Sequence, residues 1–198
     1  MDERQVTVEG VTHELPRPFT VMATQNPIEY EGTFPLPEAQ LDRFLITINL
    51  GYPSVEQELS IINNQETVHP IESLGQVLSS DDILSIQEAV KTVYVDDLIR
   101  EYIVGLVDKS RNHAEAALGA SPRGSLALFR GTQALALIRG RDFVLPDDVK
   151  ELAVPMLSHR IIVSPAGLML GIQSTYIVEE LIEQIAVPGA QTSGWFRT

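Results

Sequence analysis

The hydrophobic period of the sequence changes at Gly51-Tyr52-Pro53, and this change limits the folds that the chain can adopt. Before it, short apolar runs alternate with prolines and glycines, which is typical of strands and turns. After it, apolar residues recur at helical spacing for most of the remaining chain. A hairpin and two strands do not make a stable sheet alone. We therefore expect a mainly α protein with a small β part, in which a partial α/β core precedes an all-α bundle.

The sequence before Gly51 predicts a hairpin, two strands and a short helix. Apolar and polar residues alternate on either side of Glu9-Gly10, which predicts the hairpin. The two strands are predicted from runs of β-branched and aromatic residues. The expected ranges are 5–15 for the hairpin, 19–24 and 44–50 for the strands, and 38–42 for the helix.

Five or six helices are predicted after Pro53, from capping signals and apolar stripes. Ser54 with Gln57 fits a capping box, and Ser121-Pro122 places an N-cap serine before a proline at the first helical position. One helix carries the stripe Leu98, Ile99, Tyr102, Ile103, Leu106 and Val107. The starts are expected at residues 54, 79, 96, 121, 146 and 174, with an extended segment at 161–163.

Composition excludes several classes of function. The chain has 198 residues, a formal net charge of −13 and no cysteine. The acidity disfavours nucleic acid as a partner, and Arg139 with Arg141 is too small a basic patch to change that. No apolar run approaches the length of a membrane span, and the N-terminus lacks the pattern of a secretory signal. We expect a cytoplasmic protein without disulfides or thiolate metal sites.

Asn26 is the first candidate site residue. It follows the predicted strand 19–24 and precedes Pro27. A polar side chain at the carboxyl end of a buried strand lies where α/β folds bind ligands. The more ordinary interpretation of this position alone is that Asn26 caps the turn before the proline.

Arg43 is the second candidate, beside Asp42 and just before the predicted strand 44–50. An arginine in this position could meet a phosphate, including one bound to another subunit. A local ion pair with Asp42, which would contribute little at a surface, is the simpler alternative.

Arg123 is the third candidate, in the first turn of the helix that begins at Ser121-Pro122. The helix dipole disfavours a cation there. An anion that binds at the same helix N-terminus would remove the misfit. The alternative is an exposed arginine with no role.

Other catalytic patterns are absent from the sequence. The four histidines lack metal-ligand spacing, and neither HExxH nor GxSxG occurs. The sequence also lacks GxxxxGK[ST], the phosphate-binding loop, and an apolar strand that ends in Asp-Glu to hold Mg²⁺.

Two segments carry a resemblance to a known family. FTVMATQNPIEYEGTFPLPEAQLDRFLI, residues 19–46, closely resembles the MoxR family of AAA+ ATPases. GASPRGSLALFRGTQALALIRGRDFVLPDDVKELAVPMLSHRI, residues 119–161, resembles the helical lid of the same family. The similarity extends from about Glu3 to Pro188 and implies a partial P-loop AAA+ core followed by a helical lid.

The resemblance also implies roles for the candidates. Asn26 matches sensor 1, which helps to orient the attacking water at ATP, and Arg43 matches the arginine finger, which acts on the nucleotide of a neighbouring subunit. Arg123 matches sensor 2, which contacts the phosphates from the lid. The expected cofactors are ATP and Mg²⁺, with the Mg²⁺ ligands upstream of this sequence. Gly124 stands where the family pattern has alanine, which should weaken the helix start by less than about 1 kcal/mol.

The resemblance implies a hexameric ring that remodels or matures client proteins, including proteins with von Willebrand A domains. Because the phosphate-binding loop is missing, we expect negligible ATP hydrolysis by this chain alone. The alternative is a nucleotide-independent helical adaptor or regulatory subunit. We expect residues 1–52 to belong to the AAA+ core, 53–187 to form the lid, and 188–198 to form a loose tail.

Overall fold

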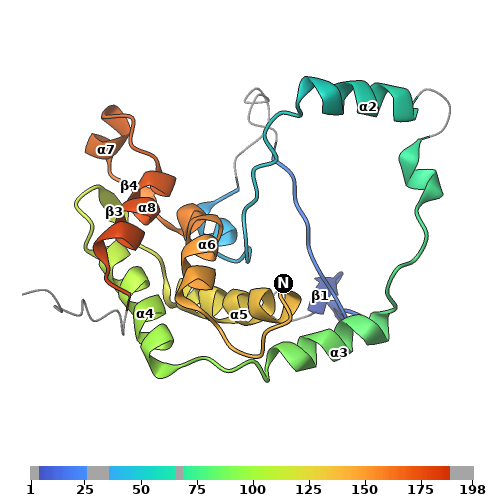
Figure 1. Cartoon of the computed structure of the whole chain (residues 1–198), viewed down its shortest axis with the longest axis horizontal. Helices are drawn as coiled ribbons and strands as arrows, with labels where there is room; N and C mark the ends of the chain where they lie inside the picture. The colour runs from blue at the N-terminus through green and yellow to red at the C-terminus, as the bar shows by residue number, and fades with distance from the viewer. Residues whose placement is uncertain (1–4, 26–35, 66–68, 188–198) are drawn as a thin grey trace, which may run out of the picture.

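The structure is a computed structural model that describes residues 5–25, 36–65 and 69–187. Most of its buried surface lies in a bundle of four helices (Figure 1). These helices are α4 (Asp97–Arg111), α5 (Pro122–Ile138), α6 (Pro146–Leu157) and α8 (Ser174–Gln184).

Short elements connect the helices of the bundle. Strand β3 (Ala116–Leu118) pairs antiparallel with β4 (Ile162–Val163), and the 3-10 helix η2 (Ser158–Arg160) links α6 to β4. Helix α7 (Pro165–Met169) follows, capped by Ser164, whose side chain accepts a hydrogen bond from the amide of Gly167. The extended segment was predicted from sequence, whereas β3, η2 and α7 were not.

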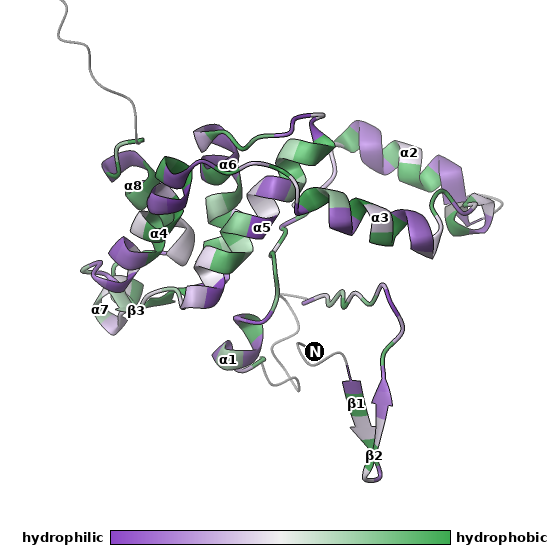
Figure 2. Cartoon of the chain, turned by 90° about the horizontal axis from the view of Figure 1, so that it is seen from below, coloured by the Kyte–Doolittle hydropathy of each residue, from purple (hydrophilic) through white to green (hydrophobic). Residues whose placement is uncertain are grey.

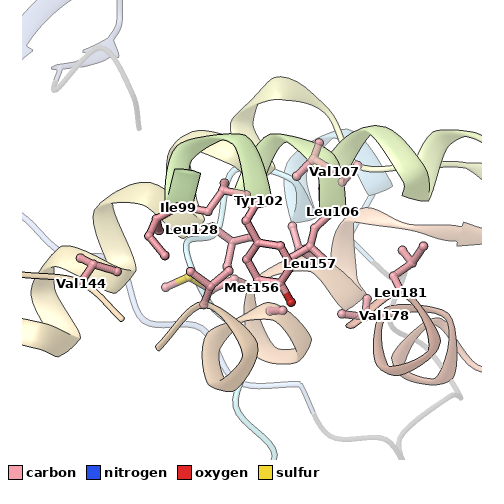
Figure 3. Packing of buried hydrophobic residues seen from close by; sticks show 14 of the residues in the cluster. Ile99, Tyr102, Leu106, Val107, Leu128, Val144, Met156, Leu157, Val178 and Leu181 are labelled. Atoms are coloured by element: carbon pink, nitrogen blue, oxygen red, sulfur yellow. The ribbon is translucent and has the colours of Figure 1, made fainter. Parts of the chain in front are cut away.

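The core of the bundle forms from the apolar stripes of its helices (Figure 3). Leu106 of α4, Leu128 of α5 and Leu157 of α6 have no exposed surface. The stripe predicted on α4 is confirmed except at Leu98, which is exposed. Burial of such side chains is the dominant favourable contribution to folding.

Helix α3 (Ser80–Val90) packs beside α5. Its capping box is complete, because Ser79 Oγ accepts from the Asp82 amide and the Asp82 carboxylate accepts from the Ser79 amide. The loop after α3 is fixed by Gln133 of α5, whose buried side chain donates to the Val93 carbonyl at 2.8 Å.

The described part of the chain that precedes α3 buries little surface. It contains the hairpin β1–β2 (Gln5–Val8 and Val11–Glu14), α1 (Glu38–Leu41), α2 (Val55–Gln65) and the 3-10 helix η1 (Pro70–Ser73). The hairpin was predicted correctly and projects away from the helices (Figure 2). Helix α2 has no buried residue and lies apart from the bundle (Figure 1).

The predictions of strands at 19–24 and 44–50 are wrong, because neither segment forms a β-ladder in the structure. A strand needs a neighbour for its amide and carbonyl groups. Among the described residues, no segment pairs with either run; instead the Thr47 amide donates to the Pro155 carbonyl of α6 at 2.9 Å. The prediction failed because β-propensity is a property of one segment and does not show whether a neighbouring strand is present.

Candidate functional site

Polar side chains join the end of α1 to the helical bundle. Asp42 directly follows α1 in the chain. Its carboxylate lies 2.8 Å from Arg160 Nη1 and accepts hydrogen bonds from Ser121 Oγ at 3.1 and 3.2 Å. The same carboxylate lies 3.6 Å from Arg123 Nη1. We name Asp42, Ser121, Arg123 and Arg160 the Asp42 cluster. It brings together the end of α1, the N-terminus of α5 and the 3-10 helix η2 that follows α6.

Arg160 is the most buried member of the Asp42 cluster, with 2% of its side chain exposed. Its guanidinium donates to three backbone carbonyls, those of Asp42, Phe44 and, at 2.8 Å, Met156. A buried charge is tolerated when it is paired and hydrogen-bonded. The carboxylate and the carbonyls therefore compensate for removing this arginine from water.

The chain after Asp42 remains bound to the bundle. His159 Nε2 lies 3.1 Å from the Phe44 carbonyl oxygen, and the Ile46 side chain packs against the core. Burial lowers the pKa of His159 below its usual value, although the contact with the Phe44 carbonyl acts in the opposite direction. A neutral imidazole can donate one hydrogen bond to that carbonyl.

Arg43 lies between two residues that are held by the bundle, and its own side chain is exposed. Its amide donates to the Gln40 carbonyl at 3.1 Å. Among the described residues, the ion pairs of Asp42 are made with Arg160 and Arg123, not with Arg43. The simple Asp42–Arg43 ion pair that the sequence suggested is therefore not formed.

Arg123 lies in the first turn of α5, as predicted, and 46% of its side chain is exposed. Ser121 caps this helix, because its Oγ accepts a hydrogen bond from the Arg123 amide at 3.2 Å. Serine is among the preferred residues for this capping role. Among the described residues, the Asp42 carboxylate is an anion that lies at this N-terminus. A negative group there offsets the unfavourable position of the arginine in the field of the helix dipole.

Gly124 is buried behind Arg123. A Cβ at this position would lie 3.0 Å from Leu157 Cδ2 and 3.6 Å from Arg160 Cδ. The glycine therefore leaves room for the Leu157 side chain, which the sequence alone did not indicate. Asn26, the remaining candidate, lies outside the described residues.

The sequence analysis missed Arg160 and the role of Asp42. The two residues are 118 positions apart, and no motif connects them. Arg160 is also flanked by His159 and Ile161 in a segment that gave no site signal. Only the packing of α1 against η2 brings the pair together.

Arg139 and Arg141, the two arginines of the small basic patch, both bind the buried carboxylate of Asp148. Arg141 Nη2 lies 2.6 Å and Arg139 Nη1 3.2 Å from Asp148 Oδ1. Burial alone would raise the pKa of Asp148, but hydrogen bonds from Arg141 and the Leu145 amide, with the charges of both arginines, lower it. This network stabilises the start of α6.

The described residues contain no group of three or more histidine, aspartate or glutamate side chains arranged to hold a metal ion. In the same part of the chain, no helix combines the length and apolar character that crossing a membrane requires.

Two protein families match the chain. The family described as "ATPase family associated with various cellular activities (AAA)" matches residues 1–46, which include Asn26 and Arg43. The family described as "AAA lid domain" matches residues 108–181, which include Arg123 and most of the bundle. The members of the Asp42 cluster thus come from both matched segments.

Individual relatives give the same result. The chain is 50% identical over 188 residues to the uncharacterised protein YeaC of Bacillus subtilis, covering 95% of this chain and 59% of that protein. It is 41% identical over 197 residues to Chaperone MoxR1 of Mycobacterium tuberculosis, covering 95% and 52%. A crystal structure of a protein from Cytophaga hutchinsonii, described as a candidate ATPase, has a TM-score of 0.87 at 35% identity, covering 94% of this chain and 59% of that one.

The fold and these matches assign the chain to the AAA+ class of ATPases, with part of the AAA+ core followed by the helical lid. Within that class, the chain belongs to the MoxR family. It spans between about half and three-fifths of the length of these relatives.

Proposed function

We propose that this chain is the sensor and lid portion of a MoxR-type ATPase that binds and hydrolyses ATP with Mg²⁺. In this proposal Asn26 is sensor 1, Arg43 is the arginine finger and Arg123 is sensor 2. The core portion comprises residues 1–52 and the lid comprises residues 53–187. The Mg²⁺ ligands and the phosphate-binding loop belong to a segment upstream of this sequence.

One observation carries the proposal. Arg43 is exposed and directly follows Asp42, whose carboxylate lies 3.6 Å from Arg123 Nη1. The two candidate arginines therefore belong to a single junction between core and lid. Arginines at such a junction can stabilise charge that develops on a transferring phosphoryl group.

The names of the relatives support a proposal for the biological role. One of them is named as a chaperone. We propose that the complete protein is cytoplasmic, forms a hexameric ring, and remodels or matures client proteins, among them proteins with von Willebrand A domains. The nucleotide-independent adaptor that the sequence left open is not favoured by the family matches, since both describe parts of AAA ATPases.

The test uses the longest polypeptide that contains this chain together with an upstream phosphate-binding loop. We expect Mg²⁺-dependent ATP hydrolysis by that protein and none by residues 1–198 alone. Arg43→Ala should lower kcat by about 10³-fold or more, the range of arginine fingers. Arg100→Ala is the matched control, because Arg100 is an exposed arginine whose ion pair is with Asp97.

A mixing experiment tests whether Arg43 acts on a neighbouring subunit. Arg43→Ala subunits keep their own ATP site, and Asn26→Ala subunits keep the arginine. If the finger acts between subunits, a mixture of the two inactive variants should regain part of the activity. Activity equal to the sum of the separate variants would contradict action between subunits. Hydrolysis unaffected by Arg43→Ala would exclude Arg43 as the finger.

A further inference from the structure

The backbone on both sides of Arg43 is bound to the helical bundle by one buried side chain. Arg160 donates to the carbonyl oxygens of Asp42 and Phe44, the residues immediately before and after Arg43. The Asp42 carboxylate in turn accepts from Arg160 Nη1 at 2.8 Å. Arg43 itself remains exposed between these two anchored residues.

Further contacts extend the attachment to residue 47. His159 lies 3.1 Å from the Phe44 carbonyl, and the Thr47 amide donates to the Pro155 carbonyl at 2.9 Å. Together with Arg160, these groups come from the end of α6 and from η2. The segment 42–47 is thus fixed to one end of α6 although it forms no strand of its own.

We propose that Asp42 and Arg160 are positioning residues that hold Arg43 at a fixed place relative to the lid, so that movement of the lid moves Arg43. The proposal rests on the proposed role of Arg43 in phosphoryl transfer. It adds a mechanical connection between the nucleotide-contacting end of the lid and the arginine that serves the neighbouring subunit. Neither residue needs to contact nucleotide for this role.

Charge and burial argue that the connection is specific. The Arg160 side chain is almost fully buried, whereas 21% of the Asp42 side chain is exposed. If Asp42 moved away, the guanidinium would lose its only anionic partner among the described residues. Because an unpaired buried charge is costly, the bound arrangement is favoured. Ser121 and Arg123, at the N-terminus of α5, contact the same carboxylate, so this helix end is also attached to Asp42.

The absence of cysteine in the chain permits a direct measurement of this geometry. Spin labels on the full chain at Arg43→Cys and Glu179→Cys report the distance between the arginine position and α8 by pulsed electron paramagnetic resonance. We expect a narrow distance distribution in the otherwise unchanged chain. Asp42→Asn should broaden it at least twofold, and Arg160→Lys should broaden it less, because lysine keeps the charge but cannot make all the guanidinium contacts.

Two controls separate positioning from general stability. Asp97→Asn makes the same chemical change at an exposed ion pair with Arg100 and should leave the distribution unchanged. A second labelled pair within the lid, Leu126→Cys with Glu179→Cys, should keep its width in the Asp42→Asn chain. An unchanged width at residue 43 in Asp42→Asn would overturn the proposal. Broadening of both labelled pairs would also overturn it, since Asp42 would then stabilise the lid as a whole.

The ATPase of the longer polypeptide supplies an independent readout. A positioning role predicts that Asp42→Asn lowers kcat at least tenfold while KM for ATP changes less than threefold. A normal kcat despite a broadened distribution would overturn the proposed link between position and reaction. If Arg43→Ala leaves hydrolysis unchanged while Asp42→Asn still broadens the distance distribution, the function proposed for Arg43 is wrong. The attachment of residue 43 to the lid through Asp42 and Arg160 is then still supported.

Discussion

Helices α2 and α3 have the same length and begin in the same way, yet they differ in how far they pack against the bundle. Each has 11 residues and follows a serine that forms a capping box, Ser54 with Gln57 and Ser79 with Asp82. Neither helix has a fully buried residue, but α3 packs beside α5 and its Ile83, Leu84 and Val90 are half-buried, whereas every residue of α2 is exposed. The apolar residues of α2 are between 47% and 74% exposed: Val55, Leu59, Ile61 and Ile62. Local signals therefore determine where a helix begins, and packing determines whether it stabilises the fold.

The largest expected difference between the two regions concerns leucine truncation. Leu128→Ala in α5 should lower the free energy of unfolding by about 2–5 kcal/mol, because it removes buried methyl groups and leaves a cavity. Leu59 in α2 is exposed. Leu59→Ala should therefore change the free energy of unfolding by only about 0.5 kcal/mol or less, as is usual for surface substitutions. Urea unfolding followed by circular dichroism measures both. Equal losses would mean that α2 is packed in solution.

The next effect in size concerns the buried carboxylate of α6, which accepts hydrogen bonds from Arg141. Asp148→Asn should lower the free energy of unfolding at neutral pH by about 1.5–3 kcal/mol, the usual contribution of hydrogen bonds to charged groups. Glu56→Gln in α2 is the exposed control. Urea unfolding measures both variants, and equal losses would contradict a stabilising role for the network around Asp148.

The acid sensitivity of the bundle follows from the same residue. The pKa of Asp148 is lowered in the folded protein, so the unfolded chain binds the proton first as the pH falls. The stabilisation is fully present above the unfolded pKa of about 3.9 and is lost as the pH falls through the folded pKa. Urea midpoints between pH 5 and 3 should therefore fall more steeply for the original chain than for Asp148→Asn. Parallel curves would contradict this assignment.

Removal of the N-cap serines of α2 and α3 should give a smaller difference in the free energy of unfolding. Ser79 Oγ accepts from the Asp82 amide at the start of α3. Ser79→Ala should lower global stability by about 1 kcal/mol, the usual effect of losing an N-cap side chain. Ser54→Ala should reduce helix content at residues 55–65 and leave the unfolding midpoint almost unchanged, because every residue of α2 is exposed, whereas α3 packs beside α5. Amide hydrogen exchange locates the two effects, and a shifted midpoint in Ser54→Ala would remove the distinction between the helices.

The smallest expected effect comes from His159. Its pKa is lowered in the folded protein by burial. Its contribution to stability is therefore complete above the unfolded pKa of about 6.5. It declines as the pH falls through the folded pKa, because the unfolded chain takes up the proton first. Amide exchange at Thr47 should accelerate between pH 7 and 5, after correction for the intrinsic pH dependence of exchange, and His159→Gln should abolish the excess acceleration.

The sequence predicted the lid well for a physical reason. Capping residues and the apolar period of a helix are local properties, so they located α4, α5, α6 and α8 within a few residues. The short elements β3 and α7 were missed because three to five residues carry too little periodicity. The strands predicted at 19–24 and 44–50 depended on partner strands that local pattern cannot supply.

The candidate site was only partly accessible from the sequence. Arg43 and Arg123 were identified from their neighbours, from a helix start and from resemblance to the MoxR family, and their roles stay predictions. The buried Arg160 could not be identified, because its partners Asp42 and Phe44 are 118 and 116 positions away in the chain.

By itself, the sequence determined where the lid helices begin and which apolar residues face their common core, because both follow from hydrogen bonding and periodicity within one segment. It also determined the family. Tertiary structure alone decided that Asp42 pairs with Arg160 and Arg123 rather than with its neighbour Arg43. Asp42 pairs with Arg160 because the Arg160 guanidinium is removed from water and needs an anionic partner. That guanidinium becomes buried only when segments that are distant in the chain pack against each other.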